Sequence, residues 1–403
     1  MMTDDELKAV ASPHVLIVGA GITGLLIAQG LKKAGVGYTI FDAETPGISR
    51  RREWTLGIHW SIPILENLLP TDLAARLSEA ETNPGFVAGL DHTIQLYNSQ
   101  TGEVLKTIPT PKLRRVSRKK LRALCMEGVE VLWGKTIDSV TYDSDGAALT
   151  ARFTDGSLYH GDLLVGADGP KSKVREILLG VEKSRATAME IVYNMSIVKY
   201  GDTNKALFVQ SAHPQNVFGY NPNGIFSFLA IQDMPDPDKP ETWTFQVGSS
   251  WLGQRDANLS NEERLKNVKI AASELSEPFR SANLWMPEDT IVNTDPIAYW
   301  VPIPFETHQG RITLCGDATH PLPPHRGQGL NHCILDASNF VAAVVKIKQE
   351  QSKKEELIEA YTEELIKRGG EEVNLSLKNA LTVHDWKVFM ESPLMKHGIT
   401  KMS

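Results

Sequence analysis

Three glycines and one aspartate near the N-terminus have the residue types and spacing of a dinucleotide-binding motif. Gly19, Gly21 and Gly24 give the pattern G-x-G-x-x-G directly after the apolar run 15–18, which predicts a strand buried on both faces. A helix-length segment and a second strand-like run follow, and Asp42 ends that run, about 20 residues beyond the glycines. The glycines would admit a pyrophosphate, and Asp42 would bind a ribose. The motif predicts dinucleotide binding without distinguishing FAD from NAD.

A second stretch with a buried strand, glycines and an acid lies at residues 162–175. Its strand runs into Gly166, and the pair Asp168-Gly169 follows before a new helix. Two glycines around a carboxylate at a strand end mark a crevice where the backbone must come close to a ligand.

The third such stretch is residues 311–331. Its buried strand ends at Gly316-Asp317, and a stiff Pro-rich turn leads to a long helix. We expect Asp317 to bind ribityl or ribose hydroxyls. The N–H groups of residues 329–331 would face the pyrimidine end of an isoalloxazine ring, where negative charge develops on reduction.

Two basic stretches lie close to the first motif in sequence. Three arginines at 50–52 are candidates to meet phosphates of FAD or of an incoming NADPH, and a solvated loop explains them equally well. Residues 114–122 contain Ser117, a plausible N-cap, and Arg118 at the start of an amphipathic helix. A solvated helix start competes there with a role in cofactor binding.

The composition is that of an ordinary globular protein of about two domains, with 403 residues, 41% hydrophobic and 23% charged. A formal net charge of −7 argues against a nucleic-acid-binding surface. The three cysteines make no disulfide framework. His320 and His325 lack the further ligands that a metal site needs, so we predict no metal.

The N-terminal segment is polar and acidic and does not look like a signal peptide. No run of about 18 apolar residues occurs, so the sequence predicts no membrane helix. We therefore expect a cytoplasmic protein that binds neither nucleic acid nor membrane, as a monomer or homodimer.

The pattern of the sequence changes at residue 185, after which short strand-like runs alternate with turns. These runs are 190–197, 206–210, 224–230 and 242–248, and a helical segment follows at 261–275. The pattern predicts an antiparallel sheet inserted into the nucleotide-binding domain. Aromatic residues of this region are candidates to wall a pocket for a flat apolar substrate, or are plain core: Phe218, Tyr220, Phe226, Phe228, Trp243 and Phe245.

Together these patterns predict an α/β fold, in which a Rossmann-like domain carries an inserted antiparallel-sheet domain and a helical C-terminus. The predicted nucleotide-binding domain is discontinuous, with residues 12–77, 101–184 and 296–345. The predicted substrate-binding domain comprises residues 78–100 and 185–295, and residues 346–403 form a C-terminal helical segment.

With all three motifs in this order, the chain resembles the single-component, FAD-dependent aromatic hydroxylases, also called group A flavoprotein monooxygenases. Gly19-x-Gly21-x-x-Gly24 looks like the family's ADP-binding motif, and Asp168-Gly169 looks like its second motif. The stretch 316–320 with Pro324 and Gly327-Gln328-Gly329 looks like the third. The amino-acid sequences of segments 51–60 and 323–332 are most similar to those of fungal members that tailor natural products. Asp42 replaces the more usual Glu.

The resemblance implies tightly bound FAD and a transient visit by NADPH or NADH. By resemblance Arg118 would contact the FAD phosphate or ribose side, Asp317 the ribityl–pyrophosphate section, and Asp168-Gly169 both FAD and NADPH. The predicted cofactor contacts are Gly19, Gly21, Ile22, Thr23, Gly24, Asp42, Ala43, Arg52, Arg118, Asp168, Gly169, Asp317, Gly329, Leu330 and Asn331.

The resemblance also implies a monooxygenase that inserts one atom of O2 into an aromatic or alkene-bearing small molecule, by hydroxylation or epoxidation through a flavin C4a-hydroperoxide. Arg185, Tyr193 and Tyr220 are candidate catalytic residues from their position in the inserted sheet. Baeyer–Villiger oxidation of a ketone is an alternative within flavin chemistry. A non-catalytic FAD- or nucleotide-binding protein is an alternative from another class.

Overall fold

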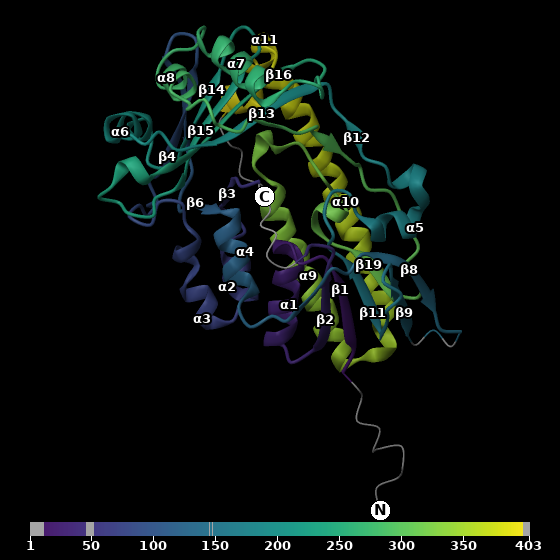
Figure 1. Cartoon of the computed structure of the whole chain (residues 1–403). Coiled ribbons are helices and arrows are strands. Elements are labelled where there is room, and N and C mark those ends of the chain that lie inside the picture. The colour runs from purple at the N-terminus through teal and green to yellow at the C-terminus, as the bar shows by residue number, and fades with distance from the viewer. Residues whose placement is uncertain (1–11, 46–51, 145, 147, 398–403) are drawn as a thin grey trace, which may run out of the picture.

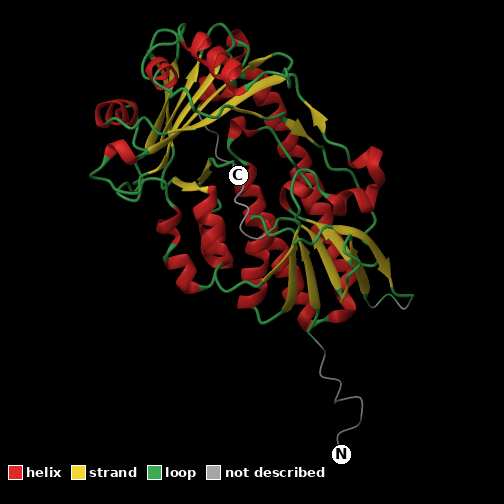
Figure 2. Ribbon diagram, in the orientation of Figure 1, coloured by secondary structure: helices red, strands yellow, loops and turns green. Residues whose placement is uncertain are grey.

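The computed structural model describes residues 12–45, 52–144, 146 and 148–397 of the chain. Two β-sheets stand one above the other, and the long helix α10 runs beside both (Figure 1). Figure 2 shows how helices cover the outer side of each sheet. The arrangement confirms the predicted α/β fold with an antiparallel insertion and a helical C-terminus.

The lower sheet in Figure 1 is parallel throughout and contains the first motif. Its five strands, in order across the sheet, are β19 (Ile312–Leu314), β11 (Leu163–Gly166), β1 (His14–Val18), β2 (Gly37–Asp42) and β7 (Val131–Trp133). Val15 of β1 pairs with Leu163 on one side and with Tyr38 on the other. Strands β11 and β19 are buried along their length, as their continuous apolar runs require.

Two different layers cover this parallel sheet. On one face, α1 (Ile22–Lys33) and α9 (Gly329–Gln349) bury Leu25 and Ile334 in the largest apolar cluster. The other face buries Phe41 against a three-stranded antiparallel sheet of β8 (Ile137–Tyr142), β9 (Leu149–Phe153) and β10 (Leu158–Gly161). The parallel sheet is therefore buried on both sides, which holds the turns at its strand ends in place.

The upper sheet has seven strands and is antiparallel except where β14 meets β4. In order they are β17 (Asn293–Thr294), β13 (Ile191–Val198), β16 (Thr244–Leu252), β15 (Phe226–Asp233), β14 (Asn216–Tyr220), β4 (Thr93–Asn98) and β5 (Val104–Pro109). Strand β5 belongs to this sheet although it lies beyond residue 100, where the sequence suggested a return to the nucleotide-binding domain.

Three helices cover the outer face of the seven-stranded sheet: α6 (Thr203–Ser211), α7 (Asn261–Ala272) and α8 (Phe279–Leu284). The prediction of a strand at 206–210 was wrong, because these residues lie in α6. Asp202 caps that helix by accepting a hydrogen bond from the Lys205 backbone N–H at 2.9 Å. A short apolar run does not by itself distinguish a strand from a helix.

Two short antiparallel ribbons connect the two sheets. Strand β3 (Thr55–Ile58) pairs with β6 (Arg114–Ser117), and β12 (Thr187–Ala188) pairs with β18 (Ala298–Tyr299). Helix α10 (Lys354–Thr382) packs on α9 near the parallel sheet, and Ala380 near its end packs on Ile191 of the upper sheet.

The remaining helices complete the layers around these elements. They are α2 (Ile62–Leu68), α3 (Thr71–Ala75), α4 (Arg118–Met126), α5 (Lys173–Ser184), α11 (Trp386–Met390) and α12 (Pro393–His397), with short 3-10 turns η1 (Leu77–Ala80), η2 (Pro240–Thr242), η3 (Gly316–Ala318), η4 (Pro324–Arg326) and η5 (Gln351–Lys353). Among the described residues, none of these helices is both long and apolar enough to cross a membrane.

Candidate active site

The three sequence motifs meet at one edge of the parallel sheet. Strands β1, β11 and β19 are neighbours, so the turns that follow them lie side by side. A Cβ atom added to Gly19 would lie 2.4 Å from the Ala167 carbonyl oxygen, and one added to Gly316 would lie 2.8 Å from Thr23 Oγ1. Segments about 150 and about 290 residues apart are thus in close contact, at the carboxyl ends of parallel strands where such sheets bind ligands.

The three glycines of the first motif differ in what surrounds them. Gly19 has φ +109°, and a Cβ on Gly24 would lie 1.9 Å from the Gly19 carbonyl oxygen. Gly21, which precedes α1, has no other described atom within 4 Å of the place where a Cβ would be. The first and third glycines therefore shape the turn, whereas the second leaves open space before a helix N-terminus, as a bound diphosphate requires.

Asp42 is bonded to the protein's own backbone. Its Oδ2 accepts a hydrogen bond from the Ala20 N–H at 2.7 Å, and its Oδ1 accepts one from the Glu44 N–H at 2.8 Å. Arg122 adds a second clamp, donating from Nε to the Ala20 carbonyl at 2.8 Å and from its guanidinium to Glu44 at 3.0 Å. The carboxylate thus fixes the glycine turn, and Ala43 beside it is exposed.

Arg118 opens α4, whose N-cap is Ser117 as predicted. Its guanidinium lies 4.8 Å from the centre of the Trp54 ring. Burial lowers the pKa of Arg118, while the nearby carboxylates of Glu53, Asp317 and Asp42 oppose that shift. Arg118 therefore lies close to carboxylates of the first and third motifs, and it makes no ion pair among the described residues.

Asp168 caps α5 with one of its carboxylate oxygens. Its Oδ2 accepts hydrogen bonds from the backbone N–H groups of Lys173 and Val174, at 2.7 and 3.2 Å. Its Oδ1 is buried and has no partner among the described residues, and burial raises the pKa of this carboxyl group. An unpaired buried acceptor beside Gly169, whose φ is +81°, suits a ligand hydroxyl.

Asp317 follows β19 in the 3-10 turn η3. Its side chain is exposed to solvent, yet burial by surrounding protein raises its pKa, so the carboxyl group faces a recess within the molecule. Cys333 donates a weak hydrogen bond to it at 3.7 Å. Asp336 fixes this turn. Its Oδ2 accepts a hydrogen bond from the Gly316 N–H at 3.0 Å and contacts His320 Nε2 at 2.6 Å.

The N-terminus of α9 completes this edge of the site. Gly329, Leu330 and Asn331 are its first residues, and its N-cap, Gln328, makes no side-chain capping bond, so their N–H groups remain available. The Asn331 side chain is fully buried. It accepts hydrogen bonds from the His59 N–H and the Ser61 hydroxyl, at 3.1 and 2.8 Å, and so ties the segment after β3 to the helix start.

This donor set fits FAD. Gly21 leaves room for the diphosphate, and the unpaired Oδ1 of Asp168 and the recessed carboxyl of Asp317 supply acceptors for sugar and ribityl hydroxyls. The N–H groups of α9 would meet the pyrimidine end of the flavin. In the described part of the chain, no cluster of three or more His, Cys, Asp or Glu is arranged for a metal.

One face of the seven-stranded sheet looks toward these turns; we call it the inner face. Strand register places Tyr193, Ser250 and Phe226 in one row of this face. Gly248 and Phe228 lie in the next row. His325, from the Pro-rich turn before α9, contacts the first row, with Nε2 at 3.1 Å from the Ser250 hydroxyl and ring centroids at 5.3 Å from Phe226.

The aromatic residues of the sheet divide between its two faces. Phe226 and Phe228, and Phe218 and Tyr220 opposite them on β14, belong to the inner face. Trp243 and Phe245 instead pack with the outer helices in the core. Period-two alternation of a strand assigns each ring to one face, so only the first group can line a site between the sheets.

The three candidate catalytic residues lie in different surroundings. Tyr193 is on the inner face, where burial raises its pKa to about 12 and Arg115 opposes the shift. Tyr220 stacks on Phe389 with ring centroids 4.0 Å apart, in an apolar cluster. Arg185 is exposed at the end of α5. Of these three candidates, only Tyr193 makes a ring contact with His325 of the third motif, with ring centroids 6.0 Å apart.

The predicted phosphate contact at Arg52 lies at the surface, where it forms an ion pair with Asp295. Arg50 and Arg51 lie outside the described residues. The ion pair joins the start of the β3 segment to the segment before β18.

Several polar residues of the site were missed by the sequence reading. Arg115 of β6 lies over the Phe228 ring at 4.9 Å. His59 and His325 are neutral at physiological pH, because burial lowers their pKa to about 4 and about 3, respectively. Arg115 belongs to the basic stretch 114–122, and the sequence offered His325 only as a metal ligand, so neither position predicted this convergence.

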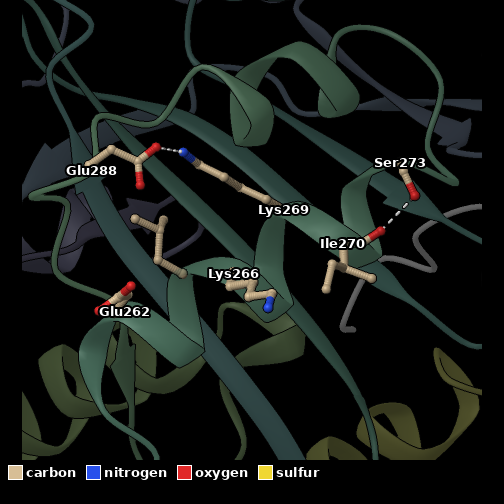
Figure 3. Close-up of a pocket in the computed structure, with 7 residues that line it drawn as sticks. Glu262, Lys266, Lys269, Ile270, Ser273 and Glu288 are labelled. Carbon is tan, nitrogen blue, oxygen red and sulfur yellow. Dashed lines mark hydrogen bonds and ion pairs between the residues drawn. The ribbon is translucent and has the colours of Figure 1, made fainter.

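A surface hollow of about 510 Å³ lies elsewhere. Figure 3 shows its lining along α7, where Lys269 pairs with Glu288. This hollow is open and lies on the outer side of the upper sheet, away from all three motifs. It is therefore not part of the site described above.

Comparison with known proteins gives the same assignment. Residues 13–374 match the family model described as FAD binding domain. The FAD-dependent monooxygenase phnB of Penicillium herquei is 43% identical over 392 residues, covering 96% of this chain and 95% of that protein. The FAD-dependent monooxygenase cctM of Talaromyces islandicus is 35% identical, covering 97% and 98%.

A solved structure is similar in fold. Klebsiella pneumoniae HpxO complexed with FAD and uric acid matches with a TM-score of 0.75 at 18% identity, covering 96% of this chain and 92% of that one. At this identity the match supports the architecture of two sheets and their helices.

Proposed function

Because the chain belongs to the FAD-binding-domain family and is an FAD-dependent monooxygenase, we propose that NADPH or NADH reduces its FAD and that one oxygen atom of O2 enters an aromatic or alkene-bearing intermediate of fungal secondary metabolism. FAD supplies hydride acceptance and oxygen activation when bound. Only one nucleotide-binding sheet occurs in the described chain, which fits a nicotinamide cofactor that visits transiently.

One observation carries the choice of an aromatic substrate. Phe226, Phe228 and Tyr193 lie on the inner face, where Phe226 and Phe228 are 3% and 6% exposed, and His325 joins that face to the turn before α9 through a 3.1 Å contact with Ser250. An aromatic wall thus stands opposite the helix start that would face the flavin. Flat electron-rich rings suit such a wall, because aromatic side chains offer both apolar area and edge-to-face contacts.

The protein's part in the reaction follows from these residues. The α9 N–H groups would stabilise negative charge at the pyrimidine end of a bound flavin. The inner face orients the ring of the substrate and excludes water. His59 and His325 take part as neutral hydrogen-bonding groups, because burial lowers their pKa to about 4 and about 3.

Oxidation of NADPH by the purified holoenzyme, with and without a panel of indoles, phenols and ketones, tests the proposal. We expect substrate-dependent acceleration and a product heavier by one oxygen atom. The position of the inserted oxygen distinguishes hydroxylation from epoxidation and from Baeyer–Villiger oxidation. Fast oxidation without any substrate, yielding only hydrogen peroxide, would contradict a monooxygenase gated by its substrate.

A further inference from the structure

Arg115 carries a guanidinium that has no counter-ion among the residues described by the structure. Its Nε donates to the Thr55 hydroxyl at 2.8 Å. No carboxylate of the described residues lies within ion-pair distance of it, and the two terminal nitrogens, with four N–H groups, have no hydrogen-bond partner there. Burial lowers the pKa of Arg115 to about 10, so the group stays charged at neutral pH. A charge so placed is costly unless an anion pairs with it.

The guanidinium is held in a fixed place. Gln246 of β16 accepts hydrogen bonds from both the N–H and the hydroxyl of Thr55, at 2.7 and 2.8 Å, and Thr55 in turn accepts from Arg115. One side of the guanidinium covers Phe228, at 4.9 Å from the ring centre. This chain of contacts orients Arg115 on the inner face before any ligand arrives, which lowers the ordering cost of binding.

Part of the Arg115 surface stays accessible although protein surrounds the side chain. Its Nη1 lies near Gly57, where an added Cβ would be 3.5 Å away, so no side chain fills that position. Tyr193 is close enough for the two groups to influence each other's pKa. The free donors of Arg115 therefore reach space beside the aromatic row.

The other titratable groups that contact this part of the inner face carry no charge at neutral pH. Burial lowers the pKa of His325 to about 3 and lowers that of His384, which is 2.8 Å from Ser250. His59 is likewise neutral, and burial keeps Tyr193 protonated. Of the groups named here, Arg115 alone would therefore offer a positive charge to an anionic ligand that enters this part of the inner face.

We propose that Arg115 is the anion receptor of the substrate site and that it selects aromatic substrates with an acidic hydroxyl, bound as the phenolate or enolate. The bidentate guanidinium would hold the ionised oxygen, and Phe228 and Phe226 would contact the ring. An ionised oxygen also makes its ring more electron-rich, so the same contact would orient and activate the substrate. The inference rests on the proposed function, since it assumes that the inner face receives the substrate.

Binding to the FAD holoenzyme at pH 8 tests this assignment through the flavin absorbance. The probes are 4-nitro-1-naphthol, which is ionised at this pH, and its methyl ether, which is neutral and nearly the same shape. We expect the wild type to bind the naphtholate at least about tenfold more tightly than the ether. Arg115→Gln should reduce this preference to about threefold or less, and Arg115→Lys should retain an intermediate part of it.

Arg114→Gln is the matched control. Arg114 is the neighbouring residue of β6 but pairs with Glu81 at 3.2 Å and Glu66 at 3.8 Å. The control variant should keep the full preference for the naphtholate, which separates a local contact from the general loss of one positive charge.

Three results would overturn the inference. The first is a wild type that binds both probes equally or neither. The second is tighter binding of 1-naphthoate than of the naphtholate, because it would reassign Arg115 to a carboxylate. The third is an Arg115→Gln variant with a shifted flavin reduction potential and unchanged probe preference, because it would assign Arg115 to the flavin. In each case, substrate-dependent oxygenation by the wild type would leave the proposed function standing, and its absence would remove that function instead.

Discussion

Arg118 and Arg115 lie three residues apart and show how the two sides of the site differ. Arg118, at the start of α4, has three carboxylates near it, from Glu53, Asp42 and Asp317. Arg115, on β6, has none among the described residues, where Tyr193 is the titratable group that favours its charged form. Neither guanidinium forms an ion pair among the described residues, but nearby carboxylates favour the charged form of Arg118 and no described carboxylate does so for Arg115.

The rest of each region follows the same division. On the nucleotide side, Asp42, Asp168 and Asp336 are bonded to backbone N–H groups and shape the turns. On the sheet side, Arg115 keeps donors that have no partner in the described part of the chain. We infer that substitutions on the nucleotide side change stability or FAD affinity, whereas those on the sheet side change substrate recognition.

The largest effect is expected for Asp336→Asn. Asp336 is fully buried and contacts His320 at 2.6 Å, Arg368 at 2.6 Å and the Gly316 N–H at 3.0 Å. Removing one partner of a buried charge network typically costs about 3–5 kcal/mol. Thermal or urea unfolding of the apoprotein measures this cost. A loss below about 1 kcal/mol would mean that the network is not essential to the third motif.

The same network predicts a pH dependence of stability. Burial acts to lower the pKa of His320, but the Asp336 carboxylate outweighs it and raises the pKa above the ordinary value of 6.5. The stabilisation from this pair is therefore complete below about pH 6.5 and is lost as pH rises through the raised pKa. Unfolding temperatures measured from pH 6 to 9 should fall in the wild type and fall less in His320→Gln. Parallel curves would contradict the pairing.

Two glycines of the first motif separate folding from cofactor binding. Gly24→Ala places a Cβ 1.9 Å from the Gly19 carbonyl oxygen, so we expect the apoprotein to lose at least about 1–3 kcal/mol. Gly21→Ala meets no described atom, and the poorer N-cap is offset by the less flexible unfolded chain, so apoprotein stability should change by less than about 1 kcal/mol. FAD titration should nevertheless show weaker binding to Gly21→Ala. Unchanged FAD affinity in this variant would place the diphosphate elsewhere.

Replacing Arg118 or Arg115 by glutamine tests whether the first belongs to the cofactor site and the second to the substrate site. Arg118→Gln should weaken FAD binding by about tenfold or more, because a charged hydrogen-bond donor is lost. Arg115→Gln should leave FAD affinity within about twofold, since we assign it to the substrate. Fluorescence titration of the apoproteins with FAD measures both. Equal losses of FAD affinity in the two variants would mean that both arginines belong to the cofactor site.

The smallest effect distinguishes two tyrosines of the inner face. Tyr193→Phe should lower product formation by about two- to tenfold, the worth of one hydrogen bond. Tyr220→Phe should have no measurable effect, because this ring stacks on Phe389 in an apolar cluster. Product analysis at matched FAD content measures both rates. A larger loss of product formation in Tyr220→Phe than in Tyr193→Phe would indicate that the substrate ring reacts closer to α11.

Sequence alone determined the nucleotide half of the molecule. The turns at Gly19, Asp168 and Asp317 each follow a short apolar run, and a residue at a strand end has its position fixed by local chain geometry. Local patterns also predicted the N-cap at Ser117. Such features depend on neighbouring residues, so spacing is sufficient to find them.

The sheet half was decided by tertiary structure. The apolar run at 206–210 became a helix because it covers the outer face, and register placed Phe228 on the inner face but Phe245 in the core. Arg115 shows why such details escape the sequence. Whether its charge is paired depends on carboxylates from distant segments, and only the folded chain determines that none of the described ones comes close.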